Sequence, residues 1–145
     1  MGQVTATKSI DINATPEKVL AALSDYSGVR PQILPDEYLD FQVLTGGTGT
    51  GTVAEWTLQA TSKRSRDVKA TVGVVDSTIT ERDDNSSMIT EYKVVPKGTG
   101  STVVTTTTWA GAGGIGGFFE RTFAPKGLNK IQDKLLGNLK GLLEK

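Results

Sequence analysis

The chain has 145 residues and no formal net charge, because 16 basic residues balance 16 acidic ones. This length favours one domain over residues 1–145, and the charge balance argues against nucleic-acid binding, which usually shows a basic excess. The sequence contains no cysteine and no histidine. This excludes disulfides, thiolate and histidine metal sites and a Ser–His–Asp triad, so we expect no metal and no cofactor.

The N-terminal part of the chain predicts a strand followed by two short helices. Residues 3–12 alternate between apolar and polar side chains, as a half-buried strand does. Residues 15–17 (Thr-Pro-Glu) form a helix start, with threonine as the N-cap, proline in the first turn and a glutamate that complements the helix dipole. The prolines at 31 and 35 leave room only for a short turn of helix between them.

The middle of the chain predicts strands joined by short turns, which indicates an antiparallel meander. No helical pattern interrupts this part, so a doubly wound parallel sheet is disfavoured. The facing of the last strand stays open, because Val103 and Val104 point to opposite sides. The strands are expected near residues 39–43, 53–61, 68–74, 77–82, 88–94 and 101–110. Their apolar faces are expected to carry Leu39, Phe41, Trp56, Leu58, Val72, Thr90 and Tyr92.

The last part of the chain, residues 111–143, is a glycine cluster that opens onto a long segment with an apolar stripe. The leucines and one isoleucine of this stripe recur every three or four residues, which predicts an amphipathic helix packed on the sheet. Pro125 is expected to end or kink the helix near Phe123. The stripe consists of Leu128, Ile131, Leu135, Leu139 and Leu142.

Two glycine-rich segments invite a nucleotide-binding interpretation, and both are better explained by local turns. Residues 111–116 match the G-x-G-x-x-G fingerprint, but the fingerprint requires a second parallel strand with an acidic residue, and none is expected here. Residues 46–51 lack the Gly-Lys-Ser/Thr ending of a P-loop and do not lead into a helix. We expect a flexible strand-to-helix connection and a glycine-rich hairpin, respectively.

Membrane contact is the weaker interpretation of the terminal helix. Lys126, Lys130 and Lys134 recur every four residues opposite the apolar stripe, as they do in helices that lie on anionic membranes. Such lysines are more often the solvated face of a helix packed on a sheet. The N-terminus does not resemble a signal peptide and no apolar run is long enough to span a membrane, so the expected location is cytoplasmic.

Side chains that could perform catalysis are sparse, and no catalytic residue is assigned. Glu55 and Glu91 fall on the polar faces of their strands, where solvation is the ordinary outcome. Tyr92 falls on an apolar face, so it is either a core tyrosine or a hydroxyl group that points into a cavity. The other candidates are Tyr26, Arg30 and Arg66.

Residues 9–35 resemble the N-terminal signature of the START-like, Bet v 1-like (SRPBCC) superfamily, and more narrowly its polyketide cyclase/dehydrase and lipid-transport group. The matching motif is I-x-A-x-P-E-x-V, followed by a helix that ends at residues 23–26 (Leu-Ser-Asp-Tyr). A glycine-containing hairpin and one long C-terminal helix extend the resemblance over essentially the whole chain. The motif residues are Ile12, Ala14, Pro16, Glu17 and Val19.

The resemblance implies an α+β helix-grip fold. In this fold a curved antiparallel sheet of six or seven strands wraps around the C-terminal helix, and two short helices follow the first strand. A cavity between the sheet and the helix binds an apolar or amphipathic small molecule. The ligand-binding residues implied here are Phe41, Trp56, Leu58, Val72, Thr90, Tyr92, Phe119 and Phe123.

Three functions are compatible with the resemblance. The first is binding or carriage of a lipid-like or polyketide-like molecule without catalysis. The second is a role in protein interaction, because one small actinobacterial-type member is described as the toxin of a toxin–antitoxin pair. The third is a polyketide cyclase- or aromatase-like enzyme, which the absence of histidine and of a convincing catalytic set disfavours. The expected partner is therefore a hydrophobic small molecule, with a protein partner as the alternative.

Overall fold

The computed structural model describes residues 3–61, 64–110 and 125–144. Within these ranges the chain forms a seven-stranded sheet, two short helices and a long C-terminal helix. The strands are β1 (Gln3–Ile12), β2 (Tyr38–Thr45), β3 (Val53–Thr61), β4 (Arg64–Val75), β5 (Thr78–Asp83), β6 (Ile89–Lys97) and β7 (Gly100–Ala110). The helices are α1 (Pro16–Ser24), α2 (Arg30–Ile33) and α4 (Pro125–Leu143).

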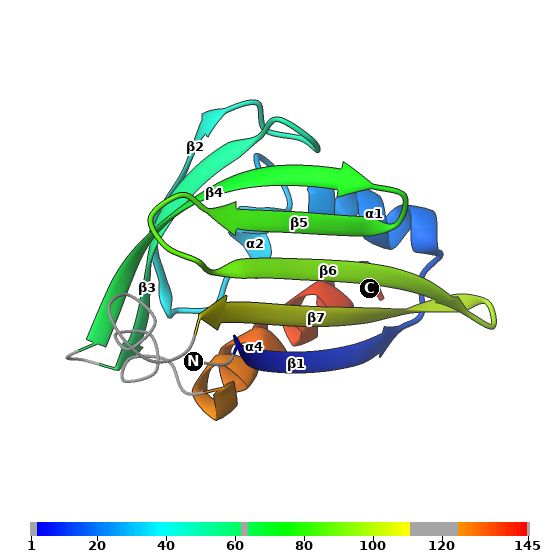
Figure 1. Ribbon diagram of the computed structural model, residues 1–145. Coiled ribbons are helices and arrows are strands. Elements are labelled where there is room, and N and C mark those ends of the chain that lie inside the picture. Colours follow the sequence, from blue (N-terminus) through cyan, green and yellow to red (C-terminus); the bar gives the residue numbers. More distant parts are fainter. Residues whose placement is uncertain (1–2, 62–63, 111–124, 145) are drawn as a thin grey trace.

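The sheet is antiparallel throughout, with the strand order β1-β7-β6-β5-β4-β3-β2. It is curved, and α4 lies against its concave side, while α1 and α2 lie behind β4, β5 and β6 in the view of Figure 1. The first two strands in the sequence therefore form the two edges of the sheet. This arrangement confirms the α+β helix-grip architecture and the antiparallel meander that the sequence predicts.

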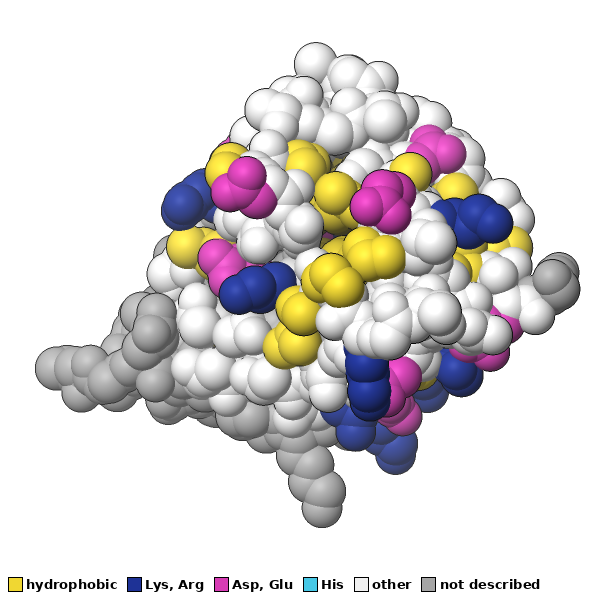
Figure 2. Space-filling model, turned by 90° about the vertical axis from the view of Figure 1, so that its right-hand side faces the viewer, with side chains coloured by type: hydrophobic (Ala, Val, Ile, Leu, Met, Phe, Trp, Pro, Cys, Tyr) yellow, Lys and Arg dark blue, Asp and Glu magenta, His cyan; other side chains and the backbone are white. Residues whose placement is uncertain are grey.

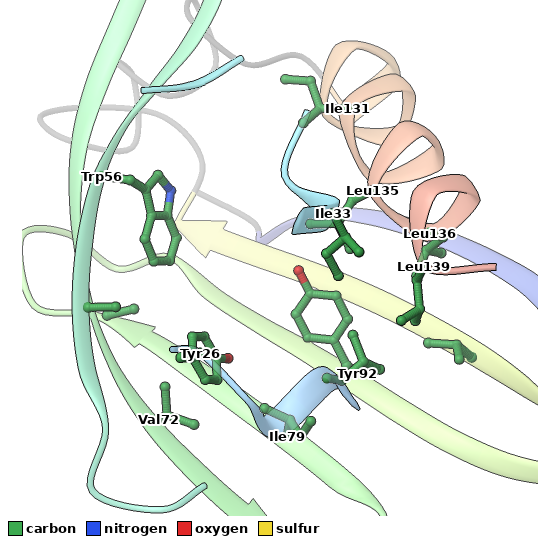
Figure 3. Close-up of a cluster of buried hydrophobic side chains, with 14 of the residues drawn as sticks. Tyr26, Ile33, Trp56, Val72, Ile79, Tyr92, Ile131, Leu135, Leu136 and Leu139 are labelled. Atoms are coloured by element: carbon green, nitrogen blue, oxygen red, sulfur yellow. The ribbon is translucent and has the colours of Figure 1, made fainter. Parts of the chain in front are cut away.

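The core lies between the concave face of the sheet and α4. The predicted apolar stripe of α4 is buried from Leu128 to Leu139, while Leu142 is half-buried, and Leu135, Leu136 and Leu139 are fully inaccessible. On the opposite side of the core, Trp56, Val72 and Ile79 point inward from β3, β4 and β5 (Figure 3). The alternation of strand residues thus places one apolar face of the sheet against the apolar face of one helix.

One strand departs from simple alternation. Leu39 is 37% exposed rather than buried, so its predicted inward position is wrong. The pairing of β2 with β3 shifts register between Leu39 and Gln42, and Asp40 adopts a positive φ of 54°. This irregularity reverses the facing of the strand, so that Tyr38 and Phe41 pack against the core instead.

The structure settles the facing of the last strand and places Pro125 at the start of α4. The inward face of β7 carries Val103, Thr105, Thr107 and Trp109, which are all buried. Pro125 is the first residue of α4, a position where its missing N–H costs nothing. The expected helix end or kink before Pro125 concerns residues outside the described ranges.

The glycine-rich segment 46–51 is a hairpin between β2 and β3, as predicted. It docks on the end of α1 through backbone hydrogen bonds. The carbonyl oxygen of Gly47 accepts from the N–H groups of Tyr26 and Ser27 at 2.8 and 3.2 Å. Gly47 has a φ of 141°, and an added Cβ would lie 2.4 Å from the Ser27 hydroxyl. The hairpin therefore holds the segment that carries Tyr26, and it requires glycine to do so.

Two glycine substitutions should have opposite effects on stability. A Cβ at Gly100 would lie 2.6 Å from the backbone oxygen of Ile12, so Gly100→Ala should destabilise the protein by about 1–3 kcal/mol. Gly137 is exposed on α4 with open space around it, so Gly137→Ala should stabilise by about 0.5–1 kcal/mol. Urea unfolding of both variants checks this, and a shift in the same direction for both would contradict it.

Candidate ligand-binding site

A group of polar side chains lies inside the apolar core, where five different elements meet. Each of these side chains is at most 6% exposed. Tyr26 follows α1, Arg30 begins α2, Glu81 lies on β5, Tyr92 on β6 and Gln132 on α4. We call these five residues the buried polar cluster. They connect the sheet, the two short helices and the long helix.

Local structure fixes the position of the arginine. Arg30 is the first residue of the four-residue helix α2, and Pro31 follows it directly. The Arg30 Nε atom donates to the backbone oxygen of Leu23, the penultimate residue of α1, at 2.8 Å. This hydrogen bond ties the guanidinium group to the end of α1 and directs it into the core.

The charge of Arg30 is neutralised inside the core. Its Nη1 atom lies 3.2 Å from Oε2 of Glu81, and the two side chains are 3% and 6% exposed. Its Nη2 atom donates to the hydroxyl of Tyr26 at 3.1 Å, and this hydroxyl donates to Oε2 of Glu81 at 2.5 Å. The three side chains therefore form a closed hydrogen-bonded group with no net charge.

Aromatic rings cover the guanidinium group. The central carbon of Arg30 lies 4.4 Å from the ring centre of Tyr26 and 4.6 Å from that of Tyr92, which is within the range of cation–π attraction. The Tyr92 hydroxyl donates to Oε1 of Gln132 at 3.3 Å, which links the cluster to α4. Figure 3 shows Tyr92 pointing from β6 toward Ile33 and Leu135.

The surroundings of the cluster raise the pKa values of Arg30, Tyr26 and Tyr92. Burial alone lowers the pKa of Arg30, but attraction to the oxygens of Tyr26 and Glu81 outweighs burial, so the pKa is raised above its usual value. Burial raises the pKa of Tyr26 well above its usual value. Burial and the negative charge of Glu81 raise the pKa of Tyr92 to about 12. Arg30 is therefore charged and the tyrosines neutral at physiological pH.

A second feature of the interior is an aromatic wall next to the cluster, formed by Tyr38, Phe41 and Trp56. The ring of Trp56 lies 5.6 Å from that of Tyr38 and 5.9 Å from that of Phe41, centre to centre. Trp56 is 6% exposed, and its Nε1–H group has no hydrogen-bond partner among the residues that the structure describes. This N–H group is a buried donor without an acceptor.

The residues implied as ligand-binding mostly face the interior. Trp56, Leu58, Val72, Thr90 and Tyr92 are buried on the concave side of the sheet, and Phe41 is half-buried beside Trp56. Phe119 and Phe123 lie outside the described residues, so their role stays a prediction. The structure thus brings six of the eight residues to one side of the sheet.

Sequence analysis missed three members of this interior: Tyr38, Glu81 and Gln132. Glu81 follows Ile79 at the spacing that puts both on one face of a strand, and Gln132 lies between Leu128 and Leu136 on one helix face. These spacings could have indicated that Glu81 and Gln132 lie on the buried faces of their strand and helix. A glutamate or glutamine on a strand or helix is usually solvated, however, and the partner Arg30 is far away in the sequence.

The other candidate polar groups lie elsewhere. Glu55 accepts from Gln42 at 2.5 Å and lines an open groove of about 390 Å³ on the side of β2, β3 and β4 that faces away from the core. Arg66 donates to the backbone oxygen of Asn85, and Glu91 is exposed. These groups do not converge with Tyr92, whose polar neighbours are Arg30 and Gln132 instead.

Charged side chains outside the core are interspersed. Figure 2 shows basic and acidic side chains mixed around a band of apolar ones on one face of the molecule. Lys134 lies 2.7 Å from Glu37, and Lys140 lies 2.6 Å from Glu144. These two lysines of α4 are thus each paired with a glutamate.

Two kinds of feature are absent from the described ranges. These ranges hold no group of three or more Asp and Glu side chains that could bind a metal ion. Within them, too, no helix combines the length and the apolar character needed to cross a membrane.

The sequence of the chain matches one known protein family. The family described as polyketide cyclase/dehydrase and lipid transport matches residues 3–144. The chain belongs to this family. The fold of this family supports hydrophobic ligand binding. The predicted membership in the START-like, Bet v 1-like superfamily is confirmed.

Solved structures share this fold. The KanY protein (ms6282), solved by NMR, is 58% identical, with a TM-score of 0.92 and 100% of both chains covered. A START superfamily protein from Mycobacterium smegmatis is 15% identical, with a TM-score of 0.71 over 99% of this chain and 98% of the other. Norcoclaurine synthase from Thalictrum flavum is also 15% identical, with a TM-score of 0.70 over 97% and 86%. Curated proteins gave no significant match.

The tyrosines of this family member make the folded state sensitive to alkaline pH. All three tyrosines of the chain (Tyr26, Tyr38 and Tyr92) have a raised pKa, mainly because of burial. The unfolded chain ionises them near pH 10, so their contribution is fully present below about pH 10 and is lost as the pH rises toward the folded values. Each should reduce stability by about 1.4 kcal/mol per pH unit in that window.

Ultraviolet absorbance of the phenolate group measures this. The folded protein should show no phenolate signal at pH 10, whereas the same titration in concentrated urea should show half-ionisation near that pH. A phenolate signal from folded protein at pH 10 would mean that the tyrosines are not buried as described.

Proposed function

We propose that the protein binds an apolar or amphipathic small molecule between the concave face of the sheet and α4, without catalysing a reaction on it. The observation that carries this proposal is the buried polar cluster, which lies in an otherwise apolar and aromatic interior. Ligand pockets typically combine apolar walls with a few fixed polar groups that orient the ligand. The family membership supports the same type of ligand.

The proposed contacts follow from the geometry of the interior. Trp56, Leu58, Val72, Thr90 and Tyr92 would line the pocket, with Phe41 at its side. Phe119 and Phe123 are predicted to complete it. The side chains of Tyr92 and Ile79 are fully buried in contact with protein atoms, so a ligand that reaches them must separate α4 from the sheet. Binding and movement of α4 are therefore expected to be coupled.

Native mass spectrometry of protein purified from its own host tests the proposal. We expect a population with the added mass of a small organic molecule, which is released when the protein is unfolded. The purified protein should also bind an uncharged apolar dye, and the released molecule should displace that dye. A protein that carries no ligand and binds no apolar dye would overturn the proposal.

Two other functions have weaker support. A cyclase-like enzyme needs polar groups that are free to act on a substrate, whereas Arg30, Glu81 and Tyr26 satisfy one another. Norcoclaurine synthase, whose structure contains dopamine and hydroxybenzaldehyde, shares the fold at 15% identity, and this likeness alone does not carry an activity over. A toxin role stays a prediction, which growth arrest on expression and relief by a neighbouring gene would support.

A further inference from the structure

The indole N–H of Trp56 is the feature of the interior that the fold does not explain. It is buried and has no acceptor within the described part of the chain. A buried donor that is left without a partner costs about 1–3 kcal/mol, and such groups are uncommon in folded proteins. In Figure 3 the nitrogen of Trp56 lies on the edge of the ring that faces the interior, on the side of α4 and Ile33. The donor is thus directed toward the proposed ligand.

The neighbours of this donor are flat and aromatic. The rings of Tyr38 and Phe41 on β2 lie 5.6 and 5.9 Å from the ring of Trp56 on the neighbouring strand β3, centre to centre. Aromatic rings pack best with other rings in offset or tilted arrangements at such distances. The Trp56 N–H can only donate, so its partner must be an acceptor such as a carbonyl or ether oxygen.

The described part of the interior offers no free positive charge to an anionic ligand. In the described ranges the buried charged side chains are Arg30, Glu81 and Asp83. Arg30 is engaged at all three nitrogens, by Leu23, Tyr26 and Glu81. Asp83 accepts from the hydroxyl of Ser86 and from the backbone N–H groups of Lys69 on β4 and of Asn85 in the turn after β5. A carboxylate that entered this interior would therefore lose its hydration without gaining a cation.

We infer that the ligand is an uncharged molecule with a flat aromatic ring and an oxygen acceptor, and that this oxygen accepts a hydrogen bond from Nε1 of Trp56. This inference rests on the proposed function and specifies its ligand class. It distinguishes the protein from a carrier of free fatty acids, whose carboxylate would need a positive partner. Trp56 is then the residue that determines specificity for the acceptor group.

Three probes with the same ring system separate the effect of an oxygen acceptor on affinity from the effect of a negative charge. Methyl 2-naphthoate carries an acceptor and no charge, 2-naphthoate carries a negative charge, and 2-ethylnaphthalene carries neither. Calorimetric titration of the full chain should show about tenfold tighter binding of the ester than of either other probe, the difference expected for one buried hydrogen bond. This comparison needs no substitution and is independent of any folding defect.

Substitution of the donor then tests the residue. Trp56→Phe keeps an aromatic ring and removes the N–H, so it should weaken binding of the ester about tenfold and leave binding of 2-ethylnaphthalene unchanged. Trp109→Phe is the matched control, because Trp109 is 1% exposed on β7 and lies outside the aromatic wall. It should preserve the tenfold preference for the ester. Circular dichroism verifies that both variants are folded.

The possible outcomes separate the inference from the proposed function. Equal affinity for the ester and the carboxylate overturns the inference, and so does a Trp56→Phe variant that weakens all three probes alike. In both cases the proposed function stands, because apolar molecules bind. Failure of all three probes to bind the folded wild-type chain overturns the inference, and the proposed function falls with it if native mass spectrometry finds no ligand.

Discussion

Replacement of Arg30 by methionine should lower the free energy of unfolding by about 3–5 kcal/mol. The substitution leaves the carboxylate of Glu81 buried without its positive partner, and removal of one member of a buried ion pair typically has this cost. Glu81→Leu should have a similar effect for the converse reason, because it leaves the guanidinium group uncompensated and also removes the acceptor of the Tyr26 hydroxyl. Urea unfolding monitored by circular dichroism measures both losses.

The double variant Arg30→Met/Glu81→Leu is the informative comparison. It removes both charges, so it should be more stable than either single variant, with the unpaired Tyr26 hydroxyl as the remaining defect. The exposed pair Lys97–Asp11 provides a control, because its side chains are 63% and 59% exposed. Lys97→Met should change stability little. Additive losses in the double variant would show that the two buried charges do not interact as the structure indicates.

Leu135→Ala and Leu139→Ala should each destabilise the protein by about 2–5 kcal/mol. Both side chains are fully buried where α4 packs on the sheet, and truncation removes apolar contact and leaves a cavity. Val75 is 71% exposed at the end of β4, so Val75→Ala is the matched control and should change stability by no more than about 0.5 kcal/mol. Thermal melts and urea unfolding give the ranking.

Substitution of the phenylalanines that precede α4 in the sequence tests whether stability and ligand binding depend on different residues. These leucines anchor the helix, whereas Phe119 and Phe123 are predicted to contact the ligand. Phe119→Ala and Phe123→Ala should therefore weaken ligand binding more than they weaken the fold. The opposite ranking in melts and dye-binding assays would contradict this division.

The sequence predicted the fold and much of the interior because periodicity records which face of an element is buried. Alternation placed Thr90 and Tyr92 on the inner face of β6, and spacings of three and four identified the buried stripe of α4. The same rule was wrong at Leu39, because the irregularity at Asp40 shifts the register of β2, and alternation alone does not reveal such a shift.

The buried polar cluster was harder to predict for a physical reason. A charged residue is expected inside a core only if its partner is known, and here Arg30 and Glu81 meet only when β5 and α2 come together in space. Sequence analysis named Arg30, Tyr26 and Tyr92 as polar candidates without connecting them. The unpartnered N–H of Trp56 is also invisible in the sequence, because every tryptophan carries such a donor and only the fold shows which acceptors it meets.

The placement of β1 has a consequence for how the chain folds. β1 pairs only with β7, in a register that joins Gln3 to Ala110 and Ile12 to Ser101, whereas each strand from β2 to β6 pairs with the next strand in the sequence. Local hairpins close quickly, while contacts between distant segments require the closure of a long loop. We therefore expect the meander to form first and β1 to join late. A chain that emerges from the ribosome would hold its first strand unpaired until almost all of the sheet had been synthesised.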